Sequence, residues 1–272
     1  MLEAILTAVI PVVLLGILCG AGLVIASKLM AVKEDERYPK IRECLPGANC
    51  GACGFAGCDG YAKALCENSD TPVNLCVPGA DTVVQQLSEL LGVESAAAEK
   101  KTAVVHCSGD CSHTQDKVDY HGLESCKAAK LLYGGKGSCT YGCLGFGDCQ
   151  KVCPQNAICL VNGVAKINPV LCVGCGLCTR TCPNRLISLI PVRETAVVLC
   201  SNKDKGALVR KICTAGCIGC KKCERSCPQG AVKVVDNLAV IDYNKCEDCP
   251  DAGICAKGCP TGAIKPVRGA FQ

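Results

Sequence analysis

The chain has 272 residues, of which 29 are cysteines, and its three Phe, six Tyr and no Trp supply little of the bulk that usually fills a hydrophobic core. Such a chain needs cross-links, and the two kinds that use cysteine are disulfides and metal centres. The formal charge of +4 counts every cysteine as neutral, so metal-bound thiolates would offset it and remove the argument for a nucleic-acid partner.

The first predicted element is a transmembrane helix over residues 4–26, a stretch without a charged side chain. As a helix it would be roughly 34 Å long, enough to cross a hydrocarbon core of about 30 Å. A cleaved signal peptide is the alternative, but Glu3 stands where such peptides carry Lys or Arg, and the apolar run is longer than usual.

Five basic residues follow this segment, namely Lys28, Lys33, Arg37, Lys40 and Arg42. By the positive-inside rule we expect a single-pass protein of the cytoplasmic (inner) membrane, with its remaining domains in the cytoplasm. Because that compartment keeps thiols reduced, and because many of the cysteines form C-x2-C pairs that suit one metal better than an unstrained disulfide, metal centres are favoured over disulfides.

A cysteine- and glycine-rich segment with the sequence LPGANCGACGFAGC comes next. Together with one later cysteine it predicts a four-thiolate site made by Cys50, Cys53, Cys58 and Cys76. The glycines let the backbone fold closely around a cofactor and leave amide N–H groups free to point at sulfur. A short helix is expected directly after Cys58, while Cys44 and Cys66 are expected to be structural or free.

The C-terminal half is one unit written twice, with a constant spacing between the two copies. Cysteines 139, 143, 149, 153 and 172 of the first copy recur as Cys213, Cys217, Cys223, Cys227 and Cys246. Four hexapeptides, CPQNAI, CPNRLI, CPQGAV and CPTGAI, each close one run. The runs that begin at Cys172 and Cys217 have the bacterial ferredoxin spacing, in which three thiolates hold one [4Fe–4S] cluster and the fourth reaches its neighbour. We therefore predict two tandem 2[4Fe–4S] ferredoxin units.

Crossed ligand sets of this kind assign sixteen cysteines to four clusters. In the first unit the predicted sets are Cys139, Cys143, Cys149 and Cys182, and Cys153, Cys172, Cys175 and Cys178. In the second unit they are Cys217, Cys220, Cys223 and Cys259, and Cys227, Cys246, Cys249 and Cys255. Cys139 enters as a substitute, because Phe146 stands where the second unit has Cys220.

With the N-terminal site this makes five [4Fe–4S] clusters, which at about −2 each would bring the net charge to about −6. Zinc is the alternative, since C-x2-C pairs also build zinc ribbons. Structural zinc favours two separated pairs over runs of four closed by proline, and a brown purified protein would speak against it.

A sixth cluster is a hypothesis for four further cysteines, Cys107, Cys126, Cys200 and Cys213. Two near copies of one strand-like stretch, TAVVHC and TAVVLC, each precede a ferredoxin unit, so their ends could face each other and share a site. Buried structural thiols are the alternative. Cys111 and Cys159 have no partner by spacing, and a mixed ligand set that includes His106, His113 or His121 stays open.

The apolar segment, then LPGANCGACGFAGC with Cys76, then tandem ferredoxin units resembles the B subunit of the Rnf complex, in its longer form with two ferredoxin units. The resemblance implies the iron–sulfur electron-transfer subunit of a membrane-bound, ion-translocating ferredoxin:NAD oxidoreductase. It also implies Rnf subunits A, C, D, E and G and soluble ferredoxin as partners, with flavins and the nicotinamide site on other chains. A polyferredoxin subunit of another membrane oxidoreductase, such as a hydrogenase, and a zinc-binding scaffold are the alternatives.

No dinucleotide fingerprint, phosphate-binding loop or activated nucleophile stands out, so no catalytic residue is predicted on this chain. The expected fold is small α+β. Its predicted parts are an anchor (1–32), a four-cysteine [4Fe–4S] domain (33–95), a linker with a strand-like segment (96–135), ferredoxin unit 1 (136–190), a connecting segment (191–212) and ferredoxin unit 2 (213–272).

Overall fold

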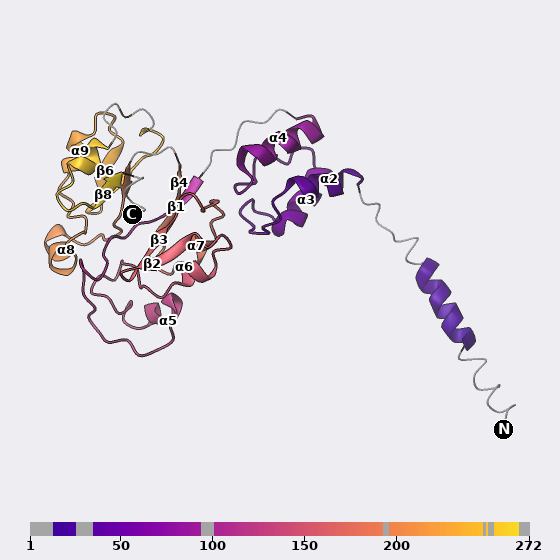
Figure 1. The fold of residues 1–272 in the computed structure, drawn as a ribbon, viewed down its shortest axis with the longest axis horizontal. Coiled ribbons are helices and arrows are strands. Elements are labelled where there is room, and N and C mark those ends of the chain that lie inside the picture. The colour runs from indigo at the N-terminus through magenta and orange to yellow at the C-terminus, as the bar shows by residue number, and fades with distance from the viewer. Residues whose placement is uncertain are drawn as a thin grey trace, which may run out of the picture. The chain divides into compact units, whose positions relative to one another are not determined.

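The chain divides into two compact parts, residues 1–40 and residues 41–272, and the second part contains both ferredoxin units. The computed structural model describes residues 13–25, 35–93, 101–192, 196–246, 249 and 253–266 (Figure 1). Residues 13–25 are helical with exposed side chains, and the rest of the predicted membrane span lies outside the described residues. Within the described ranges, no helix combines the length and the apolar character needed to cross a bilayer.

Three helices build the N-terminal cysteine-rich part, α2 (Arg37–Cys44), α3 (Gly57–Glu67) and α4 (Ala80–Leu91). The short helix expected after Cys58 is α3, which places this cysteine in its first turn. Its buried face carries Tyr61 and Leu65, and Leu87 of α4 is fully buried as well. The Tyr61 hydroxyl donates a hydrogen bond to Pro72 O at 2.6 Å, so the one large aromatic residue of this core has its polar end paired.

The ferredoxin part is built from four two-stranded antiparallel sheets in the region that the structure describes. The pairs are β1 (Lys101–Val105) with β4 (Ile187–Pro191), β2 (Ile158–Val161) with β3 (Val164–Ile167), β5 (Ala196–Val198) with β8 (Ile264–Pro266), and β6 (Val232–Val235) with β7 (Leu238–Ile241). Short helices connect them, namely α5 (Cys126–Leu131), α6 (Asp148–Lys151), α7 (Leu177–Thr181), α8 (Gly206–Ile212), α9 (Lys222–Ser226) and α10 (Ile254–Lys257).

The sequence repeat is a structural repeat. The β2–β3 and β6–β7 hairpins occupy equivalent places in the two copies, and in both turns the two central residues have positive φ: Asn162 (49°) and Gly163 (79°), then Asp236 (48°) and Asn237 (61°). Positive φ at both positions defines the type I′ turn, whose twist matches that of the flanking strands. The two units therefore share their central hairpin.

Each ferredoxin unit begins with a strand that lies outside the predicted boundaries of that unit. The opening strand β1 belongs to the expected linker and β5 to the expected connecting segment, yet β1 pairs with β4 and β5 pairs with β8. The predicted units of 136–190 and 213–272 thus each lack their first strand. Since the partner strand is far away in sequence, local pattern alone did not assign it to the unit.

A small apolar cluster joins the two ferredoxin units. Val104, Ile190, Val197 and Leu199 pack together from both units. Beside them, the His106 ring bridges two strands, with Nδ1 2.6 Å from Val198 O in β5 and Nε2 2.6 Å from Ser188 Oγ in β4. Both units are therefore held in one packed body, and the cysteine loops that they carry are brought close to one another.

Candidate iron–sulfur centres

The N-terminal cysteine loop gathers the four predicted residues. Burial raises the pKa of the Cys76 thiol, nearby Cys58, Cys53 and Cys50 raise it further, and the Gly79 amide, which donates to this sulfur, opposes them. The loop is fixed by Asn49, whose Oδ1 accepts a hydrogen bond of 2.8 Å from the Cys58 amide. Cys58 lies in the first turn of α3, and Cys76 follows the end of this helix in the sequence. The chain therefore folds back so that the two thiols lie near each other.

The second predicted set of unit 1 also lies together, around one pocket lined by Cys153, Cys172, Cys175 and Cys178. Burial raises the pKa of Cys178 to about 12, and the other three thiols contribute to this shift. Amide groups face two of the sulfurs: the Ala103 N–H donates to Cys172 Sγ at 3.4 Å, and the Ala157 N–H donates to Cys153 Sγ at 3.3 Å. Strand β1 thus supplies a donor to this site.

In unit 2 the first predicted set gathers in the same way, as do Cys227, Cys246 and Cys255 of the second set. Burial raises the pKa of Cys223 to about 11, with Cys217, Cys220 and Cys259 as neighbouring thiols, and that of Cys255 to about 11, with Cys246 and Cys227 as neighbours. Burial also acts to raise the pKa of Cys259, but amides of Ile264, Thr261 and Ala263 outweigh it and the net shift is downward. Cys220 is exposed, whereas Cys217 and Cys223 are buried.

The first set of unit 1 differs from the prediction. One pocket is lined by Cys126, Cys143, Cys149 and Cys182, and Cys139 is not among its lining residues. Burial raises the pKa of Cys149 to about 12, and the thiols that raise it further are those of Cys143, Cys126, Cys182 and Cys178. The structure therefore brings Cys126 to the place for which the sequence had offered Cys139.

A hydrogen-bonded junction explains how Cys126 reaches this pocket. Asp148, the first residue of α6, accepts hydrogen bonds at Oδ2 from Ser125 Oγ (2.8 Å) and from the Lys127 amide (3.1 Å). These two residues flank Cys126 at the start of α5. Because Asp148 directly precedes Cys149, this carboxylate holds the beginnings of two helices together and with them their two cysteines.

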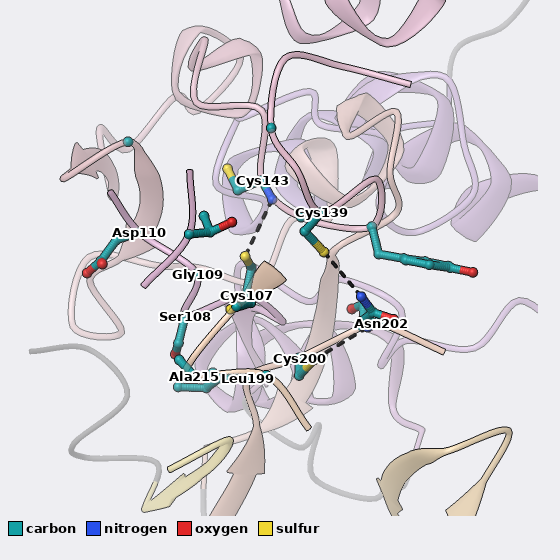
Figure 2. Close-up of a pocket in the computed structure, with 18 of the residues that line it drawn as sticks. Cys107, Ser108, Gly109, Asp110, Cys139, Cys143, Leu199, Cys200, Asn202 and Ala215 are labelled. Atoms are coloured by element: carbon teal, nitrogen blue, oxygen red, sulfur yellow. Dashed lines mark hydrogen bonds between the residues drawn. The ribbon is translucent and has the colours of Figure 1, made fainter. Parts of the chain in front are cut away.

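The predicted sixth set is brought together in part. Cys107, Cys200 and Cys213 line a cavity of about 290 Å³, and its wall also carries Cys139, Cys143 and the exposed Cys111, but Cys126 is not among its lining residues (Figure 2). Cys126 and Cys139 have thus exchanged places between two predicted sets. Their sequence distance from the other members gave no reason to prefer either arrangement.

The donor set of these sites fits an iron–sulfur cofactor. Burial raises the pKa of the Cys149 and Cys178 thiols to about 12, so without a positive partner these two thiols hold their protons, whereas a coordinating metal removes the proton outright. Cysteine is the soft ligand that iron–sulfur clusters use, and amide N–H groups directed at sulfur stabilise the cluster's charge. In the described ranges no three His, Cys, Asp or Glu side chains converge as a single metal ion would require, and a cube of four irons holds its thiolates further apart.

Three family models match segments of the chain. The model described as "Putative Fe-S cluster" matches residues 45–78, a 4Fe-4S binding domain matches residues 165–188, and a 4Fe-4S dicluster domain matches residues 216–263. The first covers all four predicted cysteine ligands of the N-terminal site. The other two fall in units 1 and 2, and so support iron–sulfur domains in each part of the described chain.

Curated relatives match almost the whole chain. This chain is 40% identical over 250 residues to the B subunit of the Na(+)-translocating ferredoxin:NAD(+) oxidoreductase complex of Acetobacterium woodii. The match covers 92% of this chain and 75% of the relative. The proton-translocating counterpart of Clostridium ljungdahlii is 42% identical over 252 residues, 92% of this chain and 89% of the relative. The B subunit of the ion-translocating oxidoreductase complex of Methanosarcina acetivorans is 41% identical over 236 residues, 86% of this chain and 89% of the relative. The chain belongs to the family of B subunits of ion-translocating ferredoxin:NAD oxidoreductases. The resemblance seen in the sequence is confirmed.

The remaining candidate ligands of this member of the B-subunit family have other contacts. Both ring nitrogens of His106 are engaged by the strands that it bridges, and burial lowers its pKa. His113 Nδ1 lies 2.7 Å from Asp110 Oδ1, and the exposed His121 pairs with Asp119 at 3.1 Å. The cysteines that no set includes are half-buried at Cys44 and Cys66 and exposed at Cys19, Cys111 and Cys159.

Proposed function

We propose that this chain relays single electrons within an ion-translocating ferredoxin:NAD oxidoreductase and holds at least five [4Fe–4S] clusters. Its family membership makes it the iron–sulfur electron-transfer subunit of such a complex, and no substrate chemistry is assigned to the chain by itself. A bound [4Fe–4S] cluster accepts and donates one electron at a time. The observation that carries the proposal is the gathering of buried and half-buried cysteines into separate four-thiol groups.

The residues of the chain prepare these groups for negative charge. Amides donate to sulfur at Cys153, Cys172 and Cys182, the last from Leu186 N–H at 3.4 Å. Such donors make a reduced cluster easier to form, while exclusion of water has the opposite effect, so the balance at each group sets its reduction potential. Exposed Cys220 makes its group the most open of those in unit 2 and the natural place for contact with a soluble redox partner.

The ligand sets that we propose follow the structure where it differs from the sequence. They are Cys50, Cys53, Cys58 and Cys76; Cys126, Cys143, Cys149 and Cys182; Cys153, Cys172, Cys175 and Cys178; Cys217, Cys220, Cys223 and Cys259; and Cys227, Cys246, Cys249 and Cys255. Four of the five sets are those predicted from spacing. The remaining set exchanges one member.

The membrane attachment and the partners belong to this proposal as well. The uncharged stretch at 4–26 is long enough to anchor the chain, and the basic residues after it favour the cytoplasmic side of the inner membrane for the cluster-bearing part. The relatives are named as subunits of ion-translocating complexes. We propose soluble ferredoxin and Rnf subunits A, C, D, E and G as the partners.

The test is anaerobic purification of the full chain in detergent, with iron, acid-labile sulfide and zinc determined on the same sample. We expect a brown protein with about 20 iron atoms or more per chain and EPR signals after reduction. Reduced ferredoxin should bleach its visible absorbance. A colourless protein with one zinc per four cysteines would overturn the proposal in favour of a zinc-binding scaffold.

A further inference from the structure

We infer that Cys107, Cys139, Cys200 and Cys213 form a sixth four-thiolate site for a [4Fe–4S] cluster, shared between the two ferredoxin units. This inference rests on the proposed function, because it extends the same cofactor chemistry to cysteines that the five sets leave over. It also requires Cys126 to be the fourth ligand of the first cluster in unit 1, since Cys139 can serve only one site.

Cys139 is the centre of the geometric argument. It lines the same cavity as Cys107, Cys200 and Cys213. Burial is the main cause that raises the pKa of these three thiols, and the nearby Cys139 thiol raises each further. Cys107 and Cys213 are both only 9% exposed. Figure 2 shows Cys107, Cys139 and Cys200 entering the pocket from separate segments, while Cys143 directs its backbone nitrogen towards Cys107. Four thiols from four segments thus surround one cavity of about 290 Å³.

The site follows the internal repeat. Cys139 and Cys213 occupy the same position in the two units. Cys107 follows strand β1 and Cys200 follows strand β5, and these strands have the same role of pairing with the last strand of their unit. Each unit therefore contributes two equivalent cysteines, as expected for a site on a pseudo-twofold axis between repeated halves.

The hydrogen bonds to the four sulfurs follow the same symmetry. The Cys143 N–H donates to Cys107 Sγ at 3.4 Å, and its equivalent in unit 2, the Cys217 N–H, donates to Cys200 Sγ at 3.3 Å. Two further donors come from Asn202, whose side-chain Nδ2 lies 3.5 Å from Cys139 Sγ and whose amide lies 3.5 Å from Cys200 Sγ. Amides of Ala215 and Gly216 face Cys213. Every sulfur of the set has an N–H donor, the arrangement that stabilises thiolates bound to iron.

The wall of the cavity is kept free at Gly109. A Cβ atom at this position would lie 3.2 Å from Cys213 Sγ and 3.8 Å from Cys107 Sγ, and would thus intrude between two of the proposed ligands. Asn202, which is 2% exposed, is also held at its Oδ1 by the Asp204 amide, at a distance of 2.7 Å. The amide orientation that points Nδ2 at Cys139 is therefore fixed by the fold.

Pairs of cysteine substitutions in the full chain, purified anaerobically, test this grouping. If both replaced cysteines are ligands of the same cluster, only that cluster is altered. If they are ligands of different clusters, two clusters are altered. We expect Cys139→Ala with Cys213→Ala to alter one cluster, and Cys126→Ala with Cys213→Ala to alter two. Native mass spectrometry and quantitative EPR count the clusters lost or reduced to three irons. The grouping predicted from the sequence gives the reverse result: two altered clusters for Cys139→Ala with Cys213→Ala, and one for Cys126→Ala with Cys213→Ala. That result would overturn the inference.

The wild-type chain separates failure of this inference from failure of the proposed function. About 24 iron atoms per chain are expected with the sixth cluster, and about 20 without it, in which case the four thiols are structural and only the inference falls. A chain that binds no iron and sulfide overturns both. Cys159→Ala, at an exposed position on β2 outside every set, serves as the control and should leave the count unchanged. Unaltered EPR signals of the N-terminal cluster show that each double variant has folded.

Discussion

The two ferredoxin units share a central hairpin, two short helices (α6 and α7 in unit 1, α9 and α10 in unit 2) and a closing strand, but they fill one position of the proposed ligand set in different ways. Unit 2 has Cys220 within its cysteine run, whereas unit 1 has Phe146 at that position, and Cys126 reaches the pocket from outside the run. The comparison teaches that such a site depends on where a sulfur lies in space and that its ligand can come from any segment that packing brings near.

The substitution is linked to an insertion. The chain between β1 and Cys139 is longer than the corresponding stretch between β5 and Cys213, and this additional length carries α5 with Cys126. Phe146 packs edge-on against Tyr120 of the same stretch, with ring centroids 5.2 Å apart, and Lys136 Nζ lies 5.7 Å from its ring centroid. An aromatic contact thus occupies in unit 1 the position of a proposed ligand in unit 2, and it helps to hold the insertion that carries Cys126.

The largest expected effect comes from breaking and then reversing this difference. Cys126→Ala should remove or degrade one cluster of unit 1, and adding Phe146→Cys should restore it, because the new thiol stands where unit 2 has its own ligand. Iron content and EPR spin counts measure both steps. Rescue of Cys139→Ala by Phe146→Cys, with no rescue of Cys126→Ala, would show that Cys139 is the ligand of this cluster.

A second, smaller effect should be equal in both units. Gly145 and Gly219 are equivalent, with φ of 77° and 63°. A Cβ added at Gly145 would lie 2.7 Å from Gly163 O, and one added at Gly219 would lie 2.9 Å from Asn237 O. Alanine at either position should lower the free energy of unfolding by about 1–3 kcal/mol, from backbone strain and the close contact. Anaerobic thermal unfolding measures this.

Gly163→Ala is the matched control for this pair. Its φ is 79°, but nothing lies within 4 Å of the added Cβ, so only the strain remains and the loss of stability should be smaller than at Gly145. A loss at Gly163 as large as at Gly145 would mean that the contact with the hairpin turn contributes nothing.

Asn202→Leu should change a potential and leave the iron content as it is. The substitution removes the side-chain N–H that faces Cys139 Sγ, and since such donors stabilise the more negative reduced form, the reduction potential of the shared site should become more negative. A redox titration followed by EPR measures it. A shift in the signals of the N-terminal cluster instead would place this Asn beside a different site.

The smallest effect is expected at the hairpin turns. Asp236→Asn gives unit 2 the residue that unit 1 has at Asn162, and removes an exposed ion pair with Lys203, whose Nζ lies 3.6 Å from Asp236 Oδ2. Exposed pairs of this kind contribute less than about 1 kcal/mol, and Asn tolerates positive φ as Asp does, so the unfolding temperature should barely change. A large decrease would mean that the two turns are not interchangeable.

What the sequence could predict was what neighbouring residues determine. Cysteines two or three positions apart must share a loop, so the sets around Cys172 and Cys217 and the tandem repeat could be found by spacing. The place of Cys126 could not be predicted in this way, because it depends on the hydrogen bonds of Asp148 with Ser125 and Lys127, which are distant from Asp148 in the sequence. One signal did exist: Cys139 and Cys213 are equivalent in the repeat, and equivalent residues in the two units are expected to have the same role.

The membership of the opening strands in the two units could not be predicted, for a related reason. The sequence TAVV predicts a strand in both copies, but so short a strand has no fixed partner until the chain returns to it, which here happens only after two cysteine runs. The N-terminal loop was easier, since its cysteines and glycines lie within one short segment and the following helix begins at its third cysteine.

The pairing of β1 with β4, and of β5 with β8, has an evolutionary consequence. Because the first and last strands of each unit lie side by side, the beginning and end of a unit are neighbours in space, as in domains that tolerate insertion and circular permutation. A gene segment that encodes such a unit can be duplicated in tandem without threading one copy through the other. Chains with further copies of the same cassette are therefore accessible to this architecture by duplication alone.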